Sequence, residues 1–340
     1  MKTGLAYDDV LIVPTRSPVD SRSEVSLQTT LCEGLTLDIP FVSAPMDTVT
    51  GPEMAQAMAD AGGMGFLHRS DIEGYDQVAA ISSVDGPVVG TVGIDGTPVS
   101  DAVELETAGA AAICVDIAHG HMERCLDVIT AIDEVITVPI IAGNVATSHG
   151  ALDMVSAGAD VVKVGIGPGS HCTTREVTGV GFPQFTAVQE VVAAVGDTVG
   201  VIADGGIRKS GDVSRALCVG ADAVMIGGLF GQCTESPAPS RREENGELVK
   251  VIRGMASEEA RVANDLLDPE NEEAVEGAET ERPEIGPVNR LLDDFSAGVR
   301  SAFSYVGAYD IEEAQRNADF VRVTPSTVER NGVHSSVYQG

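Results

Sequence analysis

The sequence predicts an α/β protein with the fold of a (β/α)8 TIM barrel, built as a single domain over residues 1–340. Two observations predict it: eight short apolar runs, and helical spacing in the segments between them. Continuous apolar runs are typical of parallel strands buried on both faces. Such barrels take about 250 residues. A doubly wound open sheet is the alternative, but no GxGxxG motif follows the first run.

The expected strands are the apolar runs themselves, at residues 40–44, 63–67, 87–93, 111–117, 138–144, 160–166, 199–205 and 222–227. The first expected helix is PEMAQAMADAG, with Pro52 near its start and Gly62 near its end, the asymmetry that helices prefer. Further helices are expected at residues 97–109, 121–136, 147–158, 185–195 and 210–219.

The chain after Gly228 departs from this repeat. Residues 235–283 are rich in charge and interrupted by prolines, and the stretch ENEEAVEGAETERPE (270–284) is expected to be mobile and solvated, within a charged mobile flap near residues 258–286. Residues 289–303 regain helical spacing and are expected to close the barrel. No second domain is expected between the repeats.

The charge balance is strongly acidic, with 52 Asp and Glu against 21 Lys and Arg and a net charge of −31. Such a surface repels nucleic acid, so we expect no nucleic-acid partner. The acidic residues are spread along the whole chain, which indicates adaptation to high salt; an acidic protein from an ordinary medium is the alternative. No apolar run is long enough for a membrane span, and the N-terminus lacks the apolar core of a signal peptide. We therefore expect a cytoplasmic protein without a membrane partner.

One cysteine stands out among the six. Cys172 lies in a loop of seventeen residues, 167–183, that follows the sixth apolar run and contains four glycines. Active sites of these barrels lie at the carboxyl ends of the strands, where loops of two to six residues are usual. A cysteine on a long glycine-rich loop there is a candidate nucleophile. The alternative is a free surface cysteine.

Two Gly-Gly pairs follow the seventh and eighth runs, Gly205–Gly206 and Gly227–Gly228. Barrels commonly bind phosphate at these two strand ends, through backbone N–H groups that a glycine leaves accessible. Asp204 ends the seventh run and could accept hydrogen bonds from ribose hydroxyls. The alternative is that the glycines only allow tight turns.

Four histidines, His68, His119, His121 and His171, also fall near strand ends and raise the hypothesis of a metal site. A metallohydrolase barrel would need converging histidines together with a carboxylate at a late strand. The eighth run ends in Met225-Ile226-Gly227-Gly228 without a carboxylate. Loop histidines, or histidines that line a cofactor channel, fit the sequence better.

Seven motifs together resemble the IMP dehydrogenase/GMP reductase family, over essentially the whole chain. They are AYDDVLIVPTRS (6–17), VSAPMDTVT (42–50), DIAHGH (116–121), AGNVAT (142–147), GIGPGSHCTTR (165–175), ADGGIRKSGD (203–212) and RGMAS (253–257). The resemblance implies a (β/α)8 barrel that forms homotetramers. It also implies chemistry at C2 of a purine nucleotide through a cysteine adduct, with a nicotinamide cofactor.

The resemblance implies a role for each matching residue. Cys172 matches the nucleophile, and Thr174 matches the threonine that helps to activate the group at C2. The expected substrate contacts, for the phosphate, ribose and purine, are Met46, Ser170, Asp204, Gly205, Gly206, Gly227, Gly228, Gly254, Met255 and Ala256.

Two further sites are implied by the same motifs. Asp116 and Ala118 fall where the nicotinamide end of the cofactor runs in the family. The backbone carbonyls of Gly167, Gly169 and Cys172 match a potassium site of the dehydrogenase branch. His171 and Ile252 depart from the pattern, since the family has an apolar residue and an aromatic there.

The resemblance favours the reductase branch, which converts GMP to IMP and ammonia with NADPH (NADH or NAD being the alternative cofactors). Dehydrogenases of the family usually carry two CBS modules between the second and third strands, for which the stretch from His68 to Pro87 has no room. They also use an Arg–Tyr pair on the flap, which residues 253–284 lack. Glu276, after RGMAS, matches the reductase glutamate that assists the departure of ammonia.

Two other functions stay open. SAPMDTVT, AHGH and IRKSGD look closer to dehydrogenases, so a dehydrogenase without CBS modules, converting IMP and NAD to XMP, is the first alternative. A non-catalytic sensor of purine nucleotides is the second, and the intact Cys172 and Thr174 speak against it.

Overall fold

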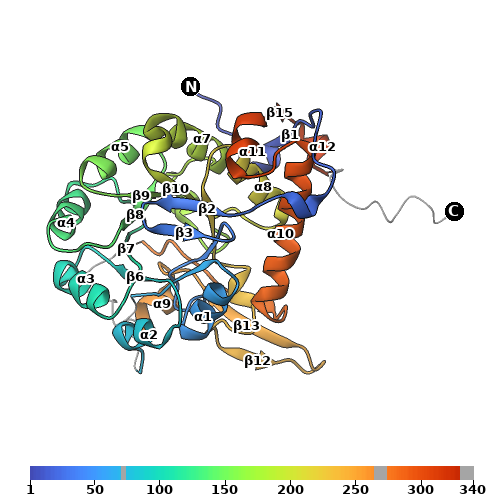
Figure 1. Ribbon diagram of the computed structural model, residues 1–340. Helices are drawn as coiled ribbons and strands as arrows, with labels where there is room; N and C mark the ends of the chain where they lie inside the picture. The colour runs from blue at the N-terminus through green and yellow to red at the C-terminus, as the bar shows by residue number, and fades with distance from the viewer. Residues whose placement is uncertain (70–73, 264–273, 330–340) are drawn as a thin grey trace.

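A computed structural model describes residues 1–69, 74–263 and 274–329, and its centre is a closed barrel of eight parallel strands (Figure 1). Each barrel strand coincides with one of the eight apolar runs, with only β8 extending one residue beyond its run, so the predicted fold is confirmed. The strands are β4 (Phe41–Ser43), β5 (Met64–Phe66), β6 (Val88–Val92), β7 (Ala112–Asp116), β8 (Ile140–Val145), β9 (Val161–Val164), β10 (Gly200–Asp204) and β11 (Ala223–Ile226). The barrel closes where β11 pairs with β4.

Side chains of alternate residues face the inside and the outside of the barrel. Val161 belongs to the cluster inside the barrel, whereas Val162 and Val164 on the same strand pack outward against the helices. A hairpin of β2 (Thr29–Cys32) and β3 (Leu35–Leu37) contributes Leu31, Leu35 and Leu37 to the inner cluster. The hairpin therefore closes the amino end of the barrel, and the carboxyl end is left for a site (Figure 1).

The helices surround the barrel as the sequence predicts. They are α1 (Pro52–Asp60), α3 (Pro98–Thr107), α4 (Glu123–Asp133), α5 (Ser148–Ser156), α7 (Gln184–Val195), α8 (Ser210–Cys218) and α10 (Val288–Tyr305). Helix α10 packs between α8 and α1 and closes the ring, as expected for residues 289–303. Pro52 and Pro98 each begin a helix, because a first-turn residue needs no N–H partner.

One barrel helix was not predicted. Helix α2 (Gln77–Ser83) lies between β5 and β6, where we expected none. It is only seven residues long, and it begins because the Asp76 carboxylate accepts the N–H groups of Val78 and Ala79. Asp76 was the signal that could have located it.

The sequence predicted no helix or strand for residues 235–283, and the structure has several of them there. The chain there forms an antiparallel sheet of β12 (Ser240–Arg242), β13 (Leu248–Arg253) and β14 (Glu279–Pro283), with α9 (Glu258–Ala263) after β13. The helix α9 and the strand β14 belong to the expected flap at 258–286, and residues 264–273 of that flap lie outside the described residues. Main-chain pairing joins the three strands, and among them only the central strand β13 has buried residues, Val249, Lys250 and Ile252.

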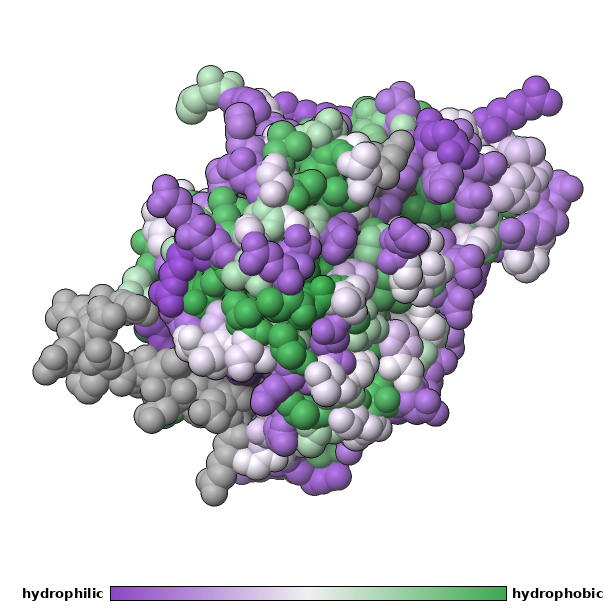
Figure 2. Space-filling model, turned by 60° about the vertical axis from the view of Figure 1, so that its left-hand side comes forward, coloured by the Kyte–Doolittle hydropathy of each residue, from purple (hydrophilic) through white to green (hydrophobic). Residues whose placement is uncertain are grey.

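The remaining elements are short. They are β1 (Val10–Ile12) paired with β15 (Phe320–Arg322), α6 (Thr174–Val177), α11 (Ile311–Asn317), α12 (Pro325–Glu329) and 3₁₀ helices at Tyr7–Asp9, Arg22–Glu24, Gly196–Thr198 and Phe230–Gln232. None of the helices in the described ranges has both the length and the apolar character needed to cross a bilayer. Figure 2 shows hydrophilic residues spread over the visible face, with apolar residues among them near its centre.

Candidate active site

A cavity of about 470 Å³ opens at the carboxyl ends of the strands. Its volume lies in the range of small-molecule sites. It brings together every residue that the sequence nominated: Met46, Asp116, Ala118, Gly167, Gly169, Ser170, Cys172, Thr174, Asp204, Gly205, Gly206, Gly227, Gly228, Gly254, Met255, Ala256 and Glu276. Their individual roles stay predictions, but their common location is a finding.

The loop after β9 presents the candidate nucleophile. Cys172 Sγ lies 3.1 Å from Thr174 Oγ1, so the thiol and the hydroxyl share a hydrogen bond. Cys172 is exposed, whereas the other five cysteines are buried or half-buried. The Arg175 guanidinium donates to the Phe182 carbonyl at 2.5 Å and holds the two ends of the loop together. An accessible thiol beside a hydroxyl fits nucleophilic chemistry better than a core cysteine does.

Residues 276–278 run antiparallel to the nucleophile loop and bring Glu276 into the cavity. The Thr173 N–H donates to the Glu276 carbonyl at 2.9 Å, and the Ala278 N–H donates to the His171 carbonyl at 3.0 Å. Cys172 and Gly277 form a β-bridge. The carboxylate of Glu276 is thereby carried by a segment that is fixed to the backbone of the nucleophile.

A buried ion pair holds the RGMAS segment over the loop that follows β4. The Arg253 Nη2 lies 2.6 Å from Asp47 Oδ2, and the Asp47 side chain has no exposed surface. The Thr48 hydroxyl also bonds to the backbone of Arg253. These contacts set Gly254, Met255 and Ala256 against the cavity, and they engage the Arg253 guanidinium with a carboxylate.

The two Gly-Gly turns meet the nucleophile loop at the other end of the cavity. Gly205 and Gly206 have φ of +90° and +81°, a conformation that other residues rarely adopt. A Cβ on Gly228 would collide with Ser170 Oγ. These glycines therefore do more than turn the chain, since they leave room between three loops for a close ligand.

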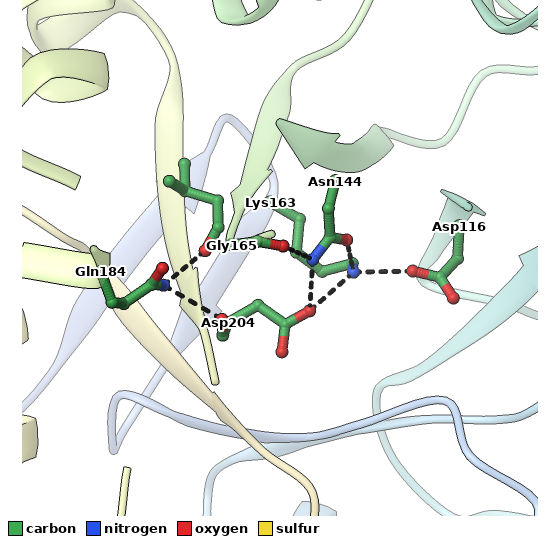
Figure 3. A network of polar contacts seen from close by, with 7 residues as sticks. Asp116, Asn144, Lys163, Gly165, Gln184 and Asp204 are labelled. Carbon is green, nitrogen blue, oxygen red and sulfur yellow. Dashed lines mark hydrogen bonds and ion pairs between the residues drawn. The ribbon is translucent and has the colours of Figure 1, made fainter. Parts of the chain in front are cut away.

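A polar network at the floor of the cavity was not predicted (Figure 3). Lys163, whose side chain is only 2% exposed, lies 2.6 Å from Asp116 Oδ1 and 2.9 Å from Asp204 Oδ2. The Asn144 amide donates to Asp204 Oδ2 at 2.8 Å and to the Gly165 carbonyl at 2.7 Å. Burial alone would lower the pKa of Lys163, but the two carboxylates outweigh it and raise that pKa.

Lys163 therefore fixes the carboxylates of Asp116 and Asp204, which the sequence assigned to cofactor and ribose. Gln184 supports the same strand ends, since its amide donates to the carbonyls of Val164 and Asp204. The signal for Lys163 was its isolated charge in the middle of an apolar run. A buried charge at such a position needs a charged or polar partner, and the sequence of the run does not identify that partner.

The four histidines near strand ends do not gather at one point, although His119 and His121 lie edge to face with ring centroids 6.4 Å apart. His121 pairs with Asp153 at 2.7 Å, His68 stacks on Tyr75 with ring centroids 3.9 Å apart, and His171 lies beside Cys172. In the part of the chain that the structure describes, no three His, Cys, Asp or Glu side chains gather as metal ligands.

The carbonyls proposed for potassium belong to the nucleophile loop. The Gly169 carbonyl accepts the Cys172 N–H at 3.2 Å, so this conformation uses it within the loop. A carbonyl oxygen has two lone pairs, so this hydrogen bond leaves one of them for a cation. The potassium site stays a prediction, and we derive no step through it.

The cofactor side of the cavity fits a polar ligand group. The Asp116 side chain keeps 25% of its surface exposed while one of its oxygens is held by Lys163. Ile117 and Ala118 continue the cavity wall beyond it. A carboxylate fixed on one side and open on the other is suited to bind a donor group of a ligand.

Residues 4–334 match the family model described as the IMP dehydrogenase / GMP reductase domain. A GMP reductase of Salmonella arizonae is 38% identical, over 94% of both chains. An inosine-5′-monophosphate dehydrogenase of Nitrosopumilus maritimus is 33% identical, over 95% of this chain and 96% of its own. A solved structure of a cysteine-to-alanine GMP reductase from Trypanosoma brucei, in complex with guanosine 5′-monophosphate, superposes with a TM-score of 0.89 at 29% identity, covering 98% of each chain.

Proposed function

The chain belongs to the IMP dehydrogenase/GMP reductase family of oxidoreductases, and within that family we propose that it is a GMP reductase. The proposed reaction is GMP + NADPH + 2 H⁺ → IMP + NADP⁺ + NH₄⁺. Members of the family work on purine nucleotides with nicotinamide cofactors. The relatives carry both names, so the choice of branch is our own inference from the residues of this chain.

The observation that carries the proposal is the place of Glu276 in the cavity of Cys172. Glu276 is the only acidic residue that lines the cavity from the segment described after residue 273. The backbone pairing of 276–278 with 171–173 holds the Glu276 backbone beside the loop that carries Cys172 and Thr174, and all three residues line the same cavity. A carboxylate there can give a proton to departing ammonia.

Cys172, Thr174 and Glu276 each have a proposed role in the reaction. The Cys172 thiolate adds to C2 of GMP, and the C2–nitrogen bond breaks as Thr174 and Glu276 pass a proton to the leaving ammonia. A bound reduced nicotinamide supplies the hydride that C2 needs. The C2–sulfur bond then breaks, the thiolate is released, and IMP leaves.

The alternative branch needs a base that activates water, since a dehydrogenase hydrolyses its adduct. Residues 253–284 contain arginines at 253, 261 and 282 and no tyrosine. Arg253 is bound to Asp47, and Arg261 donates to the Ala274 carbonyl. Both guanidiniums are engaged in these contacts, and among the described residues that line the cavity there is neither of them nor Arg282.

The test is a pair of assays on the purified protein. With GMP and NADPH, we expect loss of NADPH absorbance and an equal amount of ammonia. With IMP and NAD⁺, we expect no XMP and little steady-state NADH. XMP production without GMP-dependent oxidation of NADPH would instead assign the dehydrogenase activity. The same preparation on a sizing column with light scattering tests the homotetramer that the resemblance implies.

A further inference from the structure

His171 links the nucleophile loop to the sheet that follows the barrel. Its ring is buried, with the residue 6% exposed. Nδ1 lies 3.0 Å from Ser170 Oγ, and Nε2 lies 2.8 Å from Thr280 Oγ1 on β14. Three side chains therefore form one hydrogen-bonded chain from β14 to the rim of the cavity.

The Ser170 end of this chain lies at the expected phosphate contacts. Ser170 Oγ is so close to Gly228 that no side chain would fit there. Ser170, Gly206, Gly227 and Gly228 all line the cavity. A hydroxyl in this place binds a phosphate only if it points its proton at it, because phosphate oxygens are acceptors.

The direction of each hydrogen bond follows from the state of the imidazole. Each ring nitrogen faces a hydroxyl, and a neutral imidazole has one donor and one acceptor for the two. With the proton on Nε2, Nδ1 must accept the Ser170 proton, and the serine then offers the phosphate only lone pairs. With the proton on Nδ1, the ring donates to Ser170, and the serine proton is free for the phosphate.

The Thr280 hydroxyl can donate to Nε2 or accept from it, so its contact is compatible with either tautomer. When its hydroxyl donates to Nε2, the ring proton has to be on Nδ1. We propose, resting on the function proposed above, that His171 is a positioning residue which, set by Thr280, turns the Ser170 hydroxyl toward the 5′-phosphate of the nucleotide. The selection of a nucleotide over its nucleoside thus depends on a strand outside the barrel.

The main chain supports the same link. The Ala278 N–H donates to the His171 carbonyl, and a Cβ on Gly254 would lie 2.8 Å from that oxygen. Thr280 is in register with Ile252 of β13. The ring is therefore held between two segments, so its orientation does not depend on the ligand alone.

The experiment compares binding of GMP with binding of guanosine, by calorimetry, in wild type, His171→Val and Thr280→Val. We expect both variants to reduce the affinity for GMP roughly tenfold, since the hydrogen bond from Ser170 to the charged phosphate is lost. Guanosine, which has no phosphate, should bind within about twofold of wild type. Thr280→Ser keeps the hydroxyl and should restore GMP binding. Equal weakening of GMP and guanosine would overturn the proposal.

Two controls sharpen the result. In a Ser170→Ala background, His171→Val should cause no further loss of GMP affinity, and an undiminished loss would contradict a path through the serine. Thr30→Val removes a hydroxyl from the Thr30–Thr36 pair at the opposite end of the barrel. It should leave the affinities for GMP and guanosine unchanged.

A failure of the proposed function would be detected independently of these binding measurements, as the absence of GMP-dependent NADPH oxidation. If neither GMP nor IMP bound, inorganic phosphate would serve as the probe. Its affinity should still fall in His171→Val, and equal affinity in wild type and variant would overturn the inference.

Discussion

The Lys163 ammonium lies 2.6 Å from the Asp116 carboxylate, at the floor of the cavity. On its other side, the same ammonium meets Asp204 at 2.9 Å. The carboxylates come from β7 and β10 and face the expected cofactor and ribose. The buried Lys163 ammonium therefore fixes the separation between the carboxylates of the expected cofactor and ribose sites.

Replacing Lys163 by Met should destabilise the fold by about 3–5 kcal/mol, because two carboxylates would be left without their buried partner. Lys250→Met is the matched control. Lys250 is also buried, but its ammonium bonds to the carbonyls of Thr234 and Ser236 instead of to carboxylates. Its loss should cost about 1–3 kcal/mol. Urea denaturation of the two variants measures the difference, and equal losses would contradict the charge-based account.

Cys172→Ala should reduce turnover roughly a thousandfold or more while GMP still binds, since Asp204 and the two Gly-Gly turns lie on other loops and the substitution leaves Ser170 in place. Cys114→Ala and Cys218→Ala remove buried thiols and should lower stability without changing the chemical step. Turnover near wild type in Cys172→Ala would move the chemistry to another residue.

Iodoacetamide should label one cysteine per chain at pH 8 in the native protein. Cys172 is exposed. Burial raises the pKa of Cys32 and Cys125 to about 11 and of Cys218 and Cys233 to about 12, and it raises that of Cys114 as well. Mass spectrometry of the labelled peptides identifies the site, and rapid labelling of a second cysteine would refute this assignment.

Glu276→Gln should lower kcat roughly a hundredfold and leave the affinity for GMP within about threefold, because the carboxylate is assigned to proton transfer. Glu279→Gln, three residues along, changes an exposed carboxylate on β14 and should have no effect. Ammonia release in a single turnover is the measurement. An equal reduction of ammonia release by both substitutions would indicate that the loss of a negative charge, and not of a proton donor at residue 276, causes the effect.

Stability should rise with salt into the molar range, because the net charge of −31 is concentrated by folding and salt screens its repulsion. Melting curves in KCl and NaCl at equal ionic strength should coincide if screening is the cause. Activity that depends on KCl at low concentration and not on NaCl would instead support the potassium site. A melting temperature that does not change with salt would refute adaptation to high salt.

Acid should destabilise the fold through His68. Burial, aided by Arg253, lowers the pKa of His68 to about 4, although Asp47 opposes the shift. In the unfolded chain the same imidazole binds its proton near pH 6.5. The stabilising contribution of the neutral His68 in the folded protein is therefore complete above pH 6.5 and decreases as the pH falls toward 4. The loss is about 3 kcal/mol over this window.

His68→Gln cannot titrate, so its free energy of unfolding should fall less between pH 6.5 and 4 than that of wild type. Denaturation at fixed KCl across the window measures both curves. Curves that run parallel would assign the acid sensitivity to other groups.

The sequence by itself determined the barrel, and it nominated the loop that carries the candidate nucleophile. Strands buried on both faces need continuous apolar runs, so the eight runs located β4 to β11. Pro52 and Pro98 marked helix starts for an equally local reason. Cys172 was found because its glycine-rich loop is unusual in both length and composition.

The tertiary structure decided which distant residues work together. Lys163 meets Asp116, Asn144 and Asp204 only because three other strands end at the same height, and the run VVKVGI carries no trace of those partners. The chain that joins Ser170, His171 and Thr280 spans 110 positions. The β12–β14 sheet has few buried residues, since backbone pairing forms it, and apolar periodicity could not locate it. Contacts of this kind depend on strand register and loop closure, which a local pattern of residues does not encode.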